Sequence, residues 1–126
     1  MIPLVVFIGA GVGGVARYTL GGLVQQAATS AYPWGTLTVN ITGSLLLGFL
    51  YVLLEGTAAS PQWRAFLGIG FCGGYTTFST FSYETARLLE DGDWNRAGLY
   101  VLSSVLLSLA ATFIGFRMAH VILRRG

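Results

Sequence analysis

The stretch FCGGYTTFSTFSYE, residues 71–84, decides how this chain folds, because it places polar and helix-breaking residues inside an otherwise apolar segment. It contains two adjacent glycines, seven hydroxyl-bearing side chains, three phenylalanines and one carboxylate. Apolar residues run into it from Phe66 and continue after it towards Leu89. Its meaning depends on whether the chain around it lies in water or in lipid.

The composition indicates that most of the chain lies in a membrane. Of its 126 residues, 54% are hydrophobic and only 10% are charged, whereas soluble domains carry about 25% charged residues. A soluble protein of this length could not bury so much apolar surface in one core. We therefore expect an all-α membrane protein surrounded by lipid.

Four apolar segments are long enough to cross a bilayer as helices, at about residues 2–24, 34–54, 63–89 and 97–123. Each reaches the ~20 residues that span ~30 Å of hydrocarbon. Trp34, Trp63 and Trp94 fall at segment edges, where indole rings favour the headgroup zone. No cleavage pattern of a signal peptide follows the first segment. The sequence therefore predicts a single integral membrane domain over residues 1–126 with four crossings.

The distribution of arginines leaves the orientation open. An even number of crossings puts both termini on one side, with Arg64, Arg124 and Arg125, while Arg87 and Arg96 fall on the other side. Basic residues near helix ends normally set orientation, and here the two sides nearly balance. The chain either inserts in one orientation set by a small difference, or inserts both ways and pairs as antiparallel copies.

The run GAGVGG, residues 9–14, matches the glycine spacing of a dinucleotide-binding fingerprint. That motif needs a βαβ unit and an acidic residue about 20 positions further on, and residues 25–40 contain no Asp or Glu. Small residues four positions apart, such as Gly9 and Gly13, permit two membrane helices to approach each other closely. We interpret these glycines as packing residues and expect neither a nucleotide nor a nucleic acid among the partners.

Polar residues recur every fourth position on two of the expected helices, which places each set on one helical face. The sets are Thr36, Asn40, Ser44 and Gly48 on the second segment, and Tyr100, Ser104, Ser108 and Thr112 on the fourth. The side chains of such a stripe either form hydrogen bonds within and between helices or line an aqueous path. Asn40 is the most informative of these residues, because a side-chain amide within the membrane must point into a bundle interior or a pore.

The polar insert itself predicts a broken helix. Each glycine of the pair Gly73-Gly74 costs a helix about 1 kcal/mol relative to alanine. A broken helix at membrane depth is tolerated only where it lines a cavity or is buried in protein, and its free backbone groups can bind ions. Phe78 and Phe81 follow the break and share one face, with Ser79 and Thr80 between them.

Two motifs in this chain, GFCGGYTTFSTFSYE at residues 70–84 and WGTLTVNITGS at residues 34–44, closely resemble the signatures of the CrcB/Fluc family of fluoride channels. The resemblance implies four transmembrane helices per subunit, the third broken at its centre, in an antiparallel dual-topology homodimer. Two pores, each lined by both protomers, would let cytoplasmic fluoride leave across the inner (plasma) membrane, giving fluoride resistance. Such a protein is a passive channel and not an enzyme.

The resemblance also implies roles for individual residues. The candidate pore and anion-binding residues are Asn40, Phe78, Ser79, Thr80, Phe81, Tyr100, Ser104 and Ser108. The backbone carbonyls of Gly73 and Thr76 would hold a structural sodium ion at the dimer centre. Because glycine adopts conformations closed to other residues, we expect Gly73 to turn its carbonyl out of the helix and to tolerate substitution poorly. Arg17 is either an end anchor that snorkels or a vestibule residue that attracts anions.

The chemistry of fluoride fits these side chains. Fluoride is small and tightly hydrated, so a selective path must replace water with strong donors such as an amide NH₂ and hydroxyls. The positive edge of a phenyl ring supplies the remaining contacts. A fixed full charge in the pore would hold the ion too tightly, since conduction requires sites that also release.

Two other classes of membrane protein remain as alternatives. Proton-coupled exporters of the small multidrug type are similarly short, but they resemble one another in a carboxylate on the first helix, where this chain has only Arg17. A non-transporting assembly subunit would have no use for two polar stripes and a broken helix. No array of His, Asp and Glu indicates catalysis or metal chelation.

Overall fold

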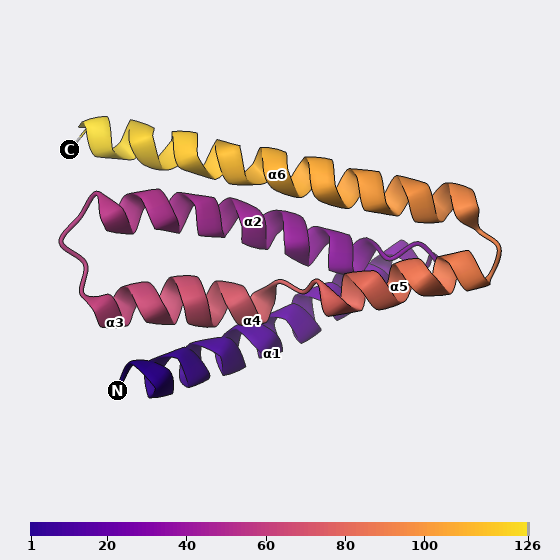
Figure 1. The fold of residues 1–126 in the computed structure, drawn as a ribbon, viewed down its shortest axis with the longest axis horizontal. Coiled ribbons are helices and arrows are strands. Elements are labelled where there is room, and N and C mark those ends of the chain that lie inside the picture. Colours follow the sequence, from indigo (N-terminus) through magenta and orange to yellow (C-terminus); the bar gives the residue numbers. More distant parts are fainter. Residues whose placement is uncertain (126) are drawn as a thin grey trace.

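The computed structural model describes residues 1–125, and that part of the chain is helical with short connections. Three long helices, α1 (Ile2–Ala28), α2 (Trp34–Glu55) and α6 (Trp94–Arg125), are each long and apolar enough to cross a membrane. Shorter elements connect α2 to α6: α3 (Pro61–Arg64), the π-helix η1 (Ala65–Cys72), α4 (Gly73–Tyr75) and α5 (Ser79–Glu90). Figure 1 shows the elements as a bundle, with the N-terminus and the end of α6 at the same end.

Local sequence explains where the helices begin and end. α1 continues to Ala28, past the predicted end at residue 24, and stops where Thr29 takes a left-handed conformation with φ 44° and ψ 42°. α3 starts at Pro61, a residue suited to the first helical turn, and the Ser60 hydroxyl accepts a hydrogen bond from the Trp63 N–H. Gly92, with φ 76°, makes the turn between α5 and α6.

The third apolar segment is interrupted at residues 76–78, and Figure 1 shows the chain there as a coil between α4 and α5. Thr76 is extended, with φ −90° and ψ 157°. The expectation for Gly73 is wrong in one respect: its φ of −63° and ψ of −39° are those of an ordinary helix. The helix therefore passes through the glycine pair and breaks after it.

Gly9 and Gly13 of α1 lie where the π-helix crosses it, which confirms these two as packing residues, whereas a Cβ at Gly11 or Gly14 would meet nothing within 4 Å. A Cβ added at Gly9 would lie 2.6 Å from the carbonyl oxygen of Phe66, and one added at Gly13 would overlap the carbonyl oxygen of Phe71. Real Cβ atoms do not approach other atoms so closely. Hydrogen alone fits at both positions, so α1 and η1 pack backbone against backbone.

A second close approach joins α2 to α6. A Cβ at Gly48 would lie 3.1 Å from the Cα of Thr112, and one at Gly115 would lie 2.6 Å from the amide nitrogen of Phe49. The Thr112 hydroxyl donates to the Ser108 carbonyl at 3.1 Å. Small residues thus bring α6 onto α2 and set the distance between the two polar stripes.

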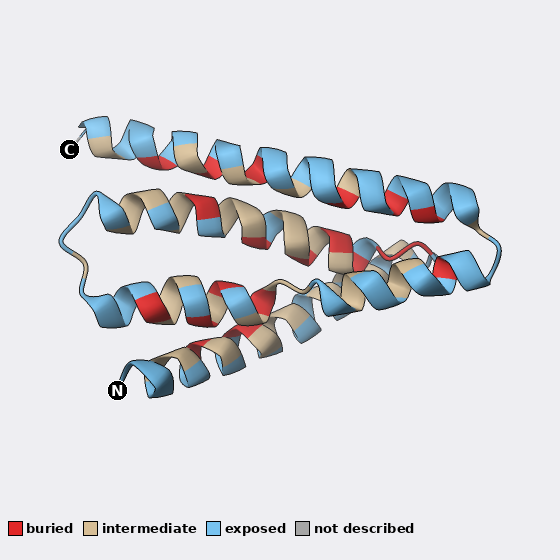
Figure 2. Ribbon diagram, in the orientation of Figure 1, coloured by how far each residue is buried: buried red, intermediate tan, exposed pale blue. Residues whose placement is uncertain are grey.

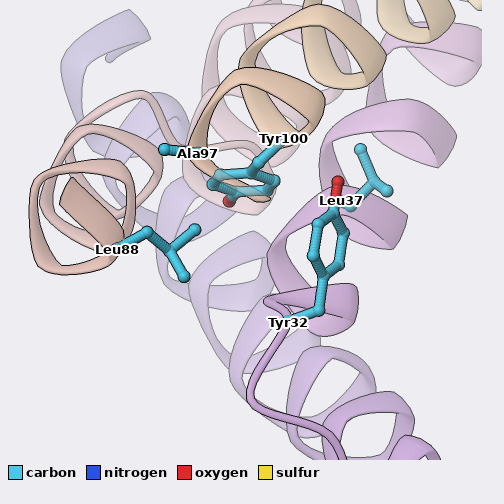
Figure 3. Packing of buried hydrophobic residues seen from close by; sticks show 5 residues of the cluster. All are labelled: Tyr32, Leu37, Leu88, Ala97 and Tyr100. Carbon is cyan, nitrogen blue, oxygen red and sulfur yellow. The ribbon is translucent and has the colours of Figure 1, made fainter. Parts of the chain in front are cut away.

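A hydrophobic cluster packs the end of the bundle that lies opposite the N-terminus, where α5 meets α2 and α6. Its buried members are Tyr32, Leu37, Leu88, Ala97 and Tyr100, and Figure 3 shows the two tyrosine rings near each other with their planes crossed. The rings of Tyr32 and Tyr100 meet edge to face, with centroids 5.7 Å apart. The outward faces of the helices remain exposed in Figure 2 and carry large apolar side chains, as expected for a protein in lipid.

Candidate pore site

An open groove of about 300 Å³ lies beside the break in the third segment. α2 contributes Asn40 and Ser44 to its lining. The other predicted residues that line it are Phe78, Phe81, Ser104 and Ser108. Residues from three separate parts of the chain therefore meet at one site.

Asn40 binds the broken backbone directly. Its side-chain Nδ2 donates to the Thr77 carbonyl at 3.0 Å, and the Thr77 N–H donates to Asn40 Oδ1 at 2.8 Å. Because donor faces acceptor at both contacts, the orientation of the amide is determined. These two bonds satisfy main-chain groups that the break removes from the helical ladder, as a break within the membrane requires. One amide hydrogen of Asn40 remains for the groove.

Thr77 lines the groove as well, although it is not among the residues predicted from the sequence. Its Oγ1 accepts a hydrogen bond from the Thr80 N–H, in the first turn of α5, at 3.1 Å. The preference for threonine just before a helix is the signal that could have found it. Ser79 and Thr80 lie in this first turn. Ser79 is exposed, with its hydroxyl 3.3 Å from that of Thr77. Ser79 and Thr80 are not among the residues that line the groove.

The two phenylalanines face the groove in different ways. Their ring centroids are 5.6 Å apart and their planes are inclined by 54°. Phe81 is half-buried and rests against the ring of Tyr100, with centroids 5.1 Å apart. Phe78 is 78% exposed and projects away from the rest of the chain. One ring is thus held in place within the chain, and the other is free to contact something outside it.

Tyr100 lies behind the groove and not on its surface. It is 0% exposed, and its hydroxyl donates to Glu84 Oε1 at 3.1 Å. The polar stripe of α6 therefore divides: Tyr100 supports Phe81 and Glu84, while Ser104 and Ser108 line the groove. Ser104 is only 7% exposed, and its hydroxyl is the one buried side-chain polar atom within residues 1–125 that lacks a hydrogen-bond partner.

On the other side of the break, Arg17 of α1 contacts the end of α4. Its Nε donates to the Gly74 carbonyl at 3.2 Å. Within the described chain, the carbonyls of Gly73 and Thr76 accept no hydrogen bond. A Cβ at Gly73 would meet nothing within 4 Å, so no other part of the described chain packs against this residue on that side.

The fold and this groove define a helical membrane protein with a polar, aromatic-lined site at a broken helix. The chain matches the family described as CrcB-like protein, Camphor Resistance (CrcB), over residues 4–116, and it belongs to that family. The resemblance predicted from the two motifs is therefore confirmed.

Relatives in this family align with the chain over nearly its whole length. A protein of Geobacter sulfurreducens is 50% identical over 118 residues, covering 93% of this chain and 95% of the relative. A protein of Pyrococcus abyssi is 46% identical over 118 residues, with 93% and 94% covered. One of Paramagnetospirillum magneticum is 42% identical over 122 residues, with 94% and 95% covered. Each of these relatives is named a fluoride-specific ion channel, FluC.

Proposed function

We propose that this chain is a passive, fluoride-selective ion channel that lets cytoplasmic fluoride leave the cell and so gives fluoride resistance. The names of its relatives support this function. The observation that carries it is the groove at the break, where the unpartnered Ser104 hydroxyl, the Asn40 amide and the two phenylalanine rings converge. A buried hydroxyl without a partner is costly, and an anion in the groove would satisfy it.

The groove supplies the contacts that a dehydrating fluoride ion needs. The Ser104 and Ser108 hydroxyls and the free hydrogen of Asn40 Nδ2 are donors, and the rims of Phe78 and Phe81 carry positive partial charge. All of these groups are neutral, so each contact can also release the ion. A proton-coupled exporter of the multidrug type is not favoured by the family comparison.

A passive path would be sufficient to drive fluoride out of a cell. We place the protein in the inner (plasma) membrane, where an interior-negative potential of ~100 mV favours outward movement of an anion by about 2.3 kcal/mol. This energy corresponds to a steady-state ratio of roughly 50-fold, at ~1.4 kcal/mol per factor of ten.

We further propose that the channel is an antiparallel homodimer of subunits that each cross the membrane four times, the third crossing being the interrupted segment of residues 61–90. Two features support assembly. The groove is open on one side of the protomer, and Phe78 projects from it with nothing in the chain to cover its ring. A second copy would close the groove and complete each pore.

We also propose that a sodium ion binds where the two breaks meet. The Gly73 and Thr76 carbonyls fit this role, because they accept no hydrogen bond within the described chain and a Cβ at Gly73 would meet open space. Neutral oxygen ligands suit a hard monovalent cation, which would offset the repulsion among converging carbonyl dipoles. Dimer stability measured in Na⁺ and in Na⁺-free buffer tests this site, and equal stability in both would refute it.

Reconstitution into liposomes tests the function. Fluoride efflux is followed with an electrode, with chloride-loaded liposomes as the control and no proton gradient applied. A channel gives rapid fluoride-selective efflux under these conditions. Efflux that requires a proton gradient would select an exporter, and absence of efflux from correctly folded protein would contradict the proposal.

A further inference from the structure

Arg17 is a charged residue in the middle of α1, and its side chain makes a specific contact with the break. It lies 11 residues before Ala28 and 15 after Ile2, which at 1.5 Å per residue is roughly 16 Å and 22 Å from the helix ends. The side chain is half-buried and turns inward to the break.

The contact that Arg17 makes is a cap on a broken helix. The last carbonyls of a helix have no partner within it, and Gly74 is the second-last residue of α4. The Arg17 Nε donates to that carbonyl at 3.2 Å. Arginine is favoured at this end of a helix because its positive charge faces the negative end of the helix dipole.

Gly74 also packs directly against the backbone of α1, the helix that carries Arg17. A Cβ at Gly74 would lie 2.9 Å from the Cα of Ala10, so only glycine permits α4 to approach α1 this closely. Three residues further along, Asn40 of α2 holds Thr77 with two hydrogen bonds. The break is therefore held from two sides, by α1 before it and by α2 after it.

We propose that Arg17 is a positioning residue for the pore: its Nε–H fixes the end of α4, and together with the Asn40 clamp it sets the path of residues 75–78 and the direction in which Phe78 projects. The expected effect of Arg17 on transport rests on the proposed channel function. Its expected effect on the backbone of residues 75–78 does not depend on fluoride transport. The competing role is attraction of anions by the guanidinium charge, since Arg17 also lines a polar pocket with Thr36 and Glu84.

Three substitutions separate the two roles atom by atom. In Arg17→Gln, the side-chain Nε2 occupies the place of the arginine Nε, so the donor stays and the charge is lost. In Arg17→Met, a methyl group takes that place, so donor and charge are both lost. In Arg17→Lys, the charge stays but a methylene takes the place of Nε and the donor moves one atom further out.

The experiment measures hydrogen exchange of peptides that contain residues 75–78, together with fluoride efflux, in all three variants. The Thr76 N–H bonds to the Cys72 carbonyl at 3.0 Å and the Thr77 N–H to Asn40, so both amides report on the break. We expect Arg17→Gln to match the wild type within about threefold. Arg17→Met and Arg17→Lys should exchange about tenfold faster at these amides and lose about tenfold in efflux, the factor that one hydrogen bond supplies. The same changes at Arg117, an exposed arginine of α6, serve as the control.

The possible outcomes decide between the roles. If Arg17→Met fails to fold while Arg17→Gln folds, the donor is required and the proposal stands. Wild-type efflux in Arg17→Lys with equal losses in the other two variants would assign the role to charge and overturn it. A wild-type rate of hydrogen exchange in Arg17→Met would also overturn the positioning role. If the wild-type protein passed no fluoride, that result would count against the channel function alone, and the exchange measurement would still test the positioning role.

Discussion

Replacing Asn40 by aspartate tests whether the amide clamp on Thr77 holds the break. The carboxylate keeps an acceptor for the Thr77 N–H, now at 2.8 Å from Oδ1, but it places an oxygen where Nδ2 donates to the Thr77 carbonyl at 3.0 Å. One hydrogen bond of about 1 kcal/mol is lost, and the half-buried carbonyl loses its partner at a further cost of about 1–3 kcal/mol. Repulsion between the two oxygens adds to this sum.

The same change also acts on the permeating ion. A negative charge about 4 Å from an anion costs about 4 kcal/mol at an effective dielectric constant of 20, and a loss of this size lowers a rate by roughly a thousandfold. We therefore expect Asn40→Asp to unfold at a lower temperature in detergent and to lose fluoride efflux almost completely. Asn40→Leu, which removes the clamp without adding charge, should be destabilised similarly.

Asn95, an exposed asparagine near the start of α6, supplies the matched control. Asn95→Asp should leave thermal unfolding and efflux unchanged, because it faces solvent and contacts neither the break nor the groove. If Asn40→Asp unfolds at the wild-type temperature and passes fluoride at the wild-type rate, the clamp and the pore assignment of Asn40 are both wrong.

The other predictions concern the rings, the glycine pair and the assembly. Phe78→Ile and Phe81→Ile keep an apolar side chain but remove the ring edge, so fluoride efflux should fall at least tenfold while the protein stays folded by size-exclusion chromatography; wild-type efflux from both would refute the role of the rings. Gly74→Ala should destabilise the protein by about 1–3 kcal/mol in thermal unfolding, because a Cβ there meets the backbone of Ala10. Gly73→Ala meets nothing within the protomer, so any loss it causes should appear in dimer content alone; equal effects of the two changes on the monomer would contradict this packing. Added lysines at both termini should force one orientation and abolish efflux, and a variant biased the opposite way should restore it on co-expression; full activity from one orientation would exclude the antiparallel dimer.

The sequence by itself determined the class of protein and the kind of site. The 54% hydrophobic composition and the segment lengths require helices in lipid, and these properties do not depend on how the helices pack. The glycine-rich, hydroxyl-rich stretch of residues 71–84 likewise indicates a broken helix whatever the packing, because the helix propensity of the backbone is a local property. The four-residue spacing also placed Asn40 and Ser44 on one face of their helix, and both lie in the groove.

Only the tertiary structure decided where the break falls and what each polar group does there. Propensity favours a break at the glycine pair, but Gly73 is helical and the chain leaves the helix at Thr76. The reason is that Asn40, distant in sequence, supplies partners for the Thr77 N–H and carbonyl, so the ladder can open at that residue without leaving those groups unsatisfied. Tyr100 likewise shares a spacing with Ser104, yet it packs against Phe81 behind the groove that Ser104 lines, because helical periodicity gives the face of a residue and not its place between neighbouring helices.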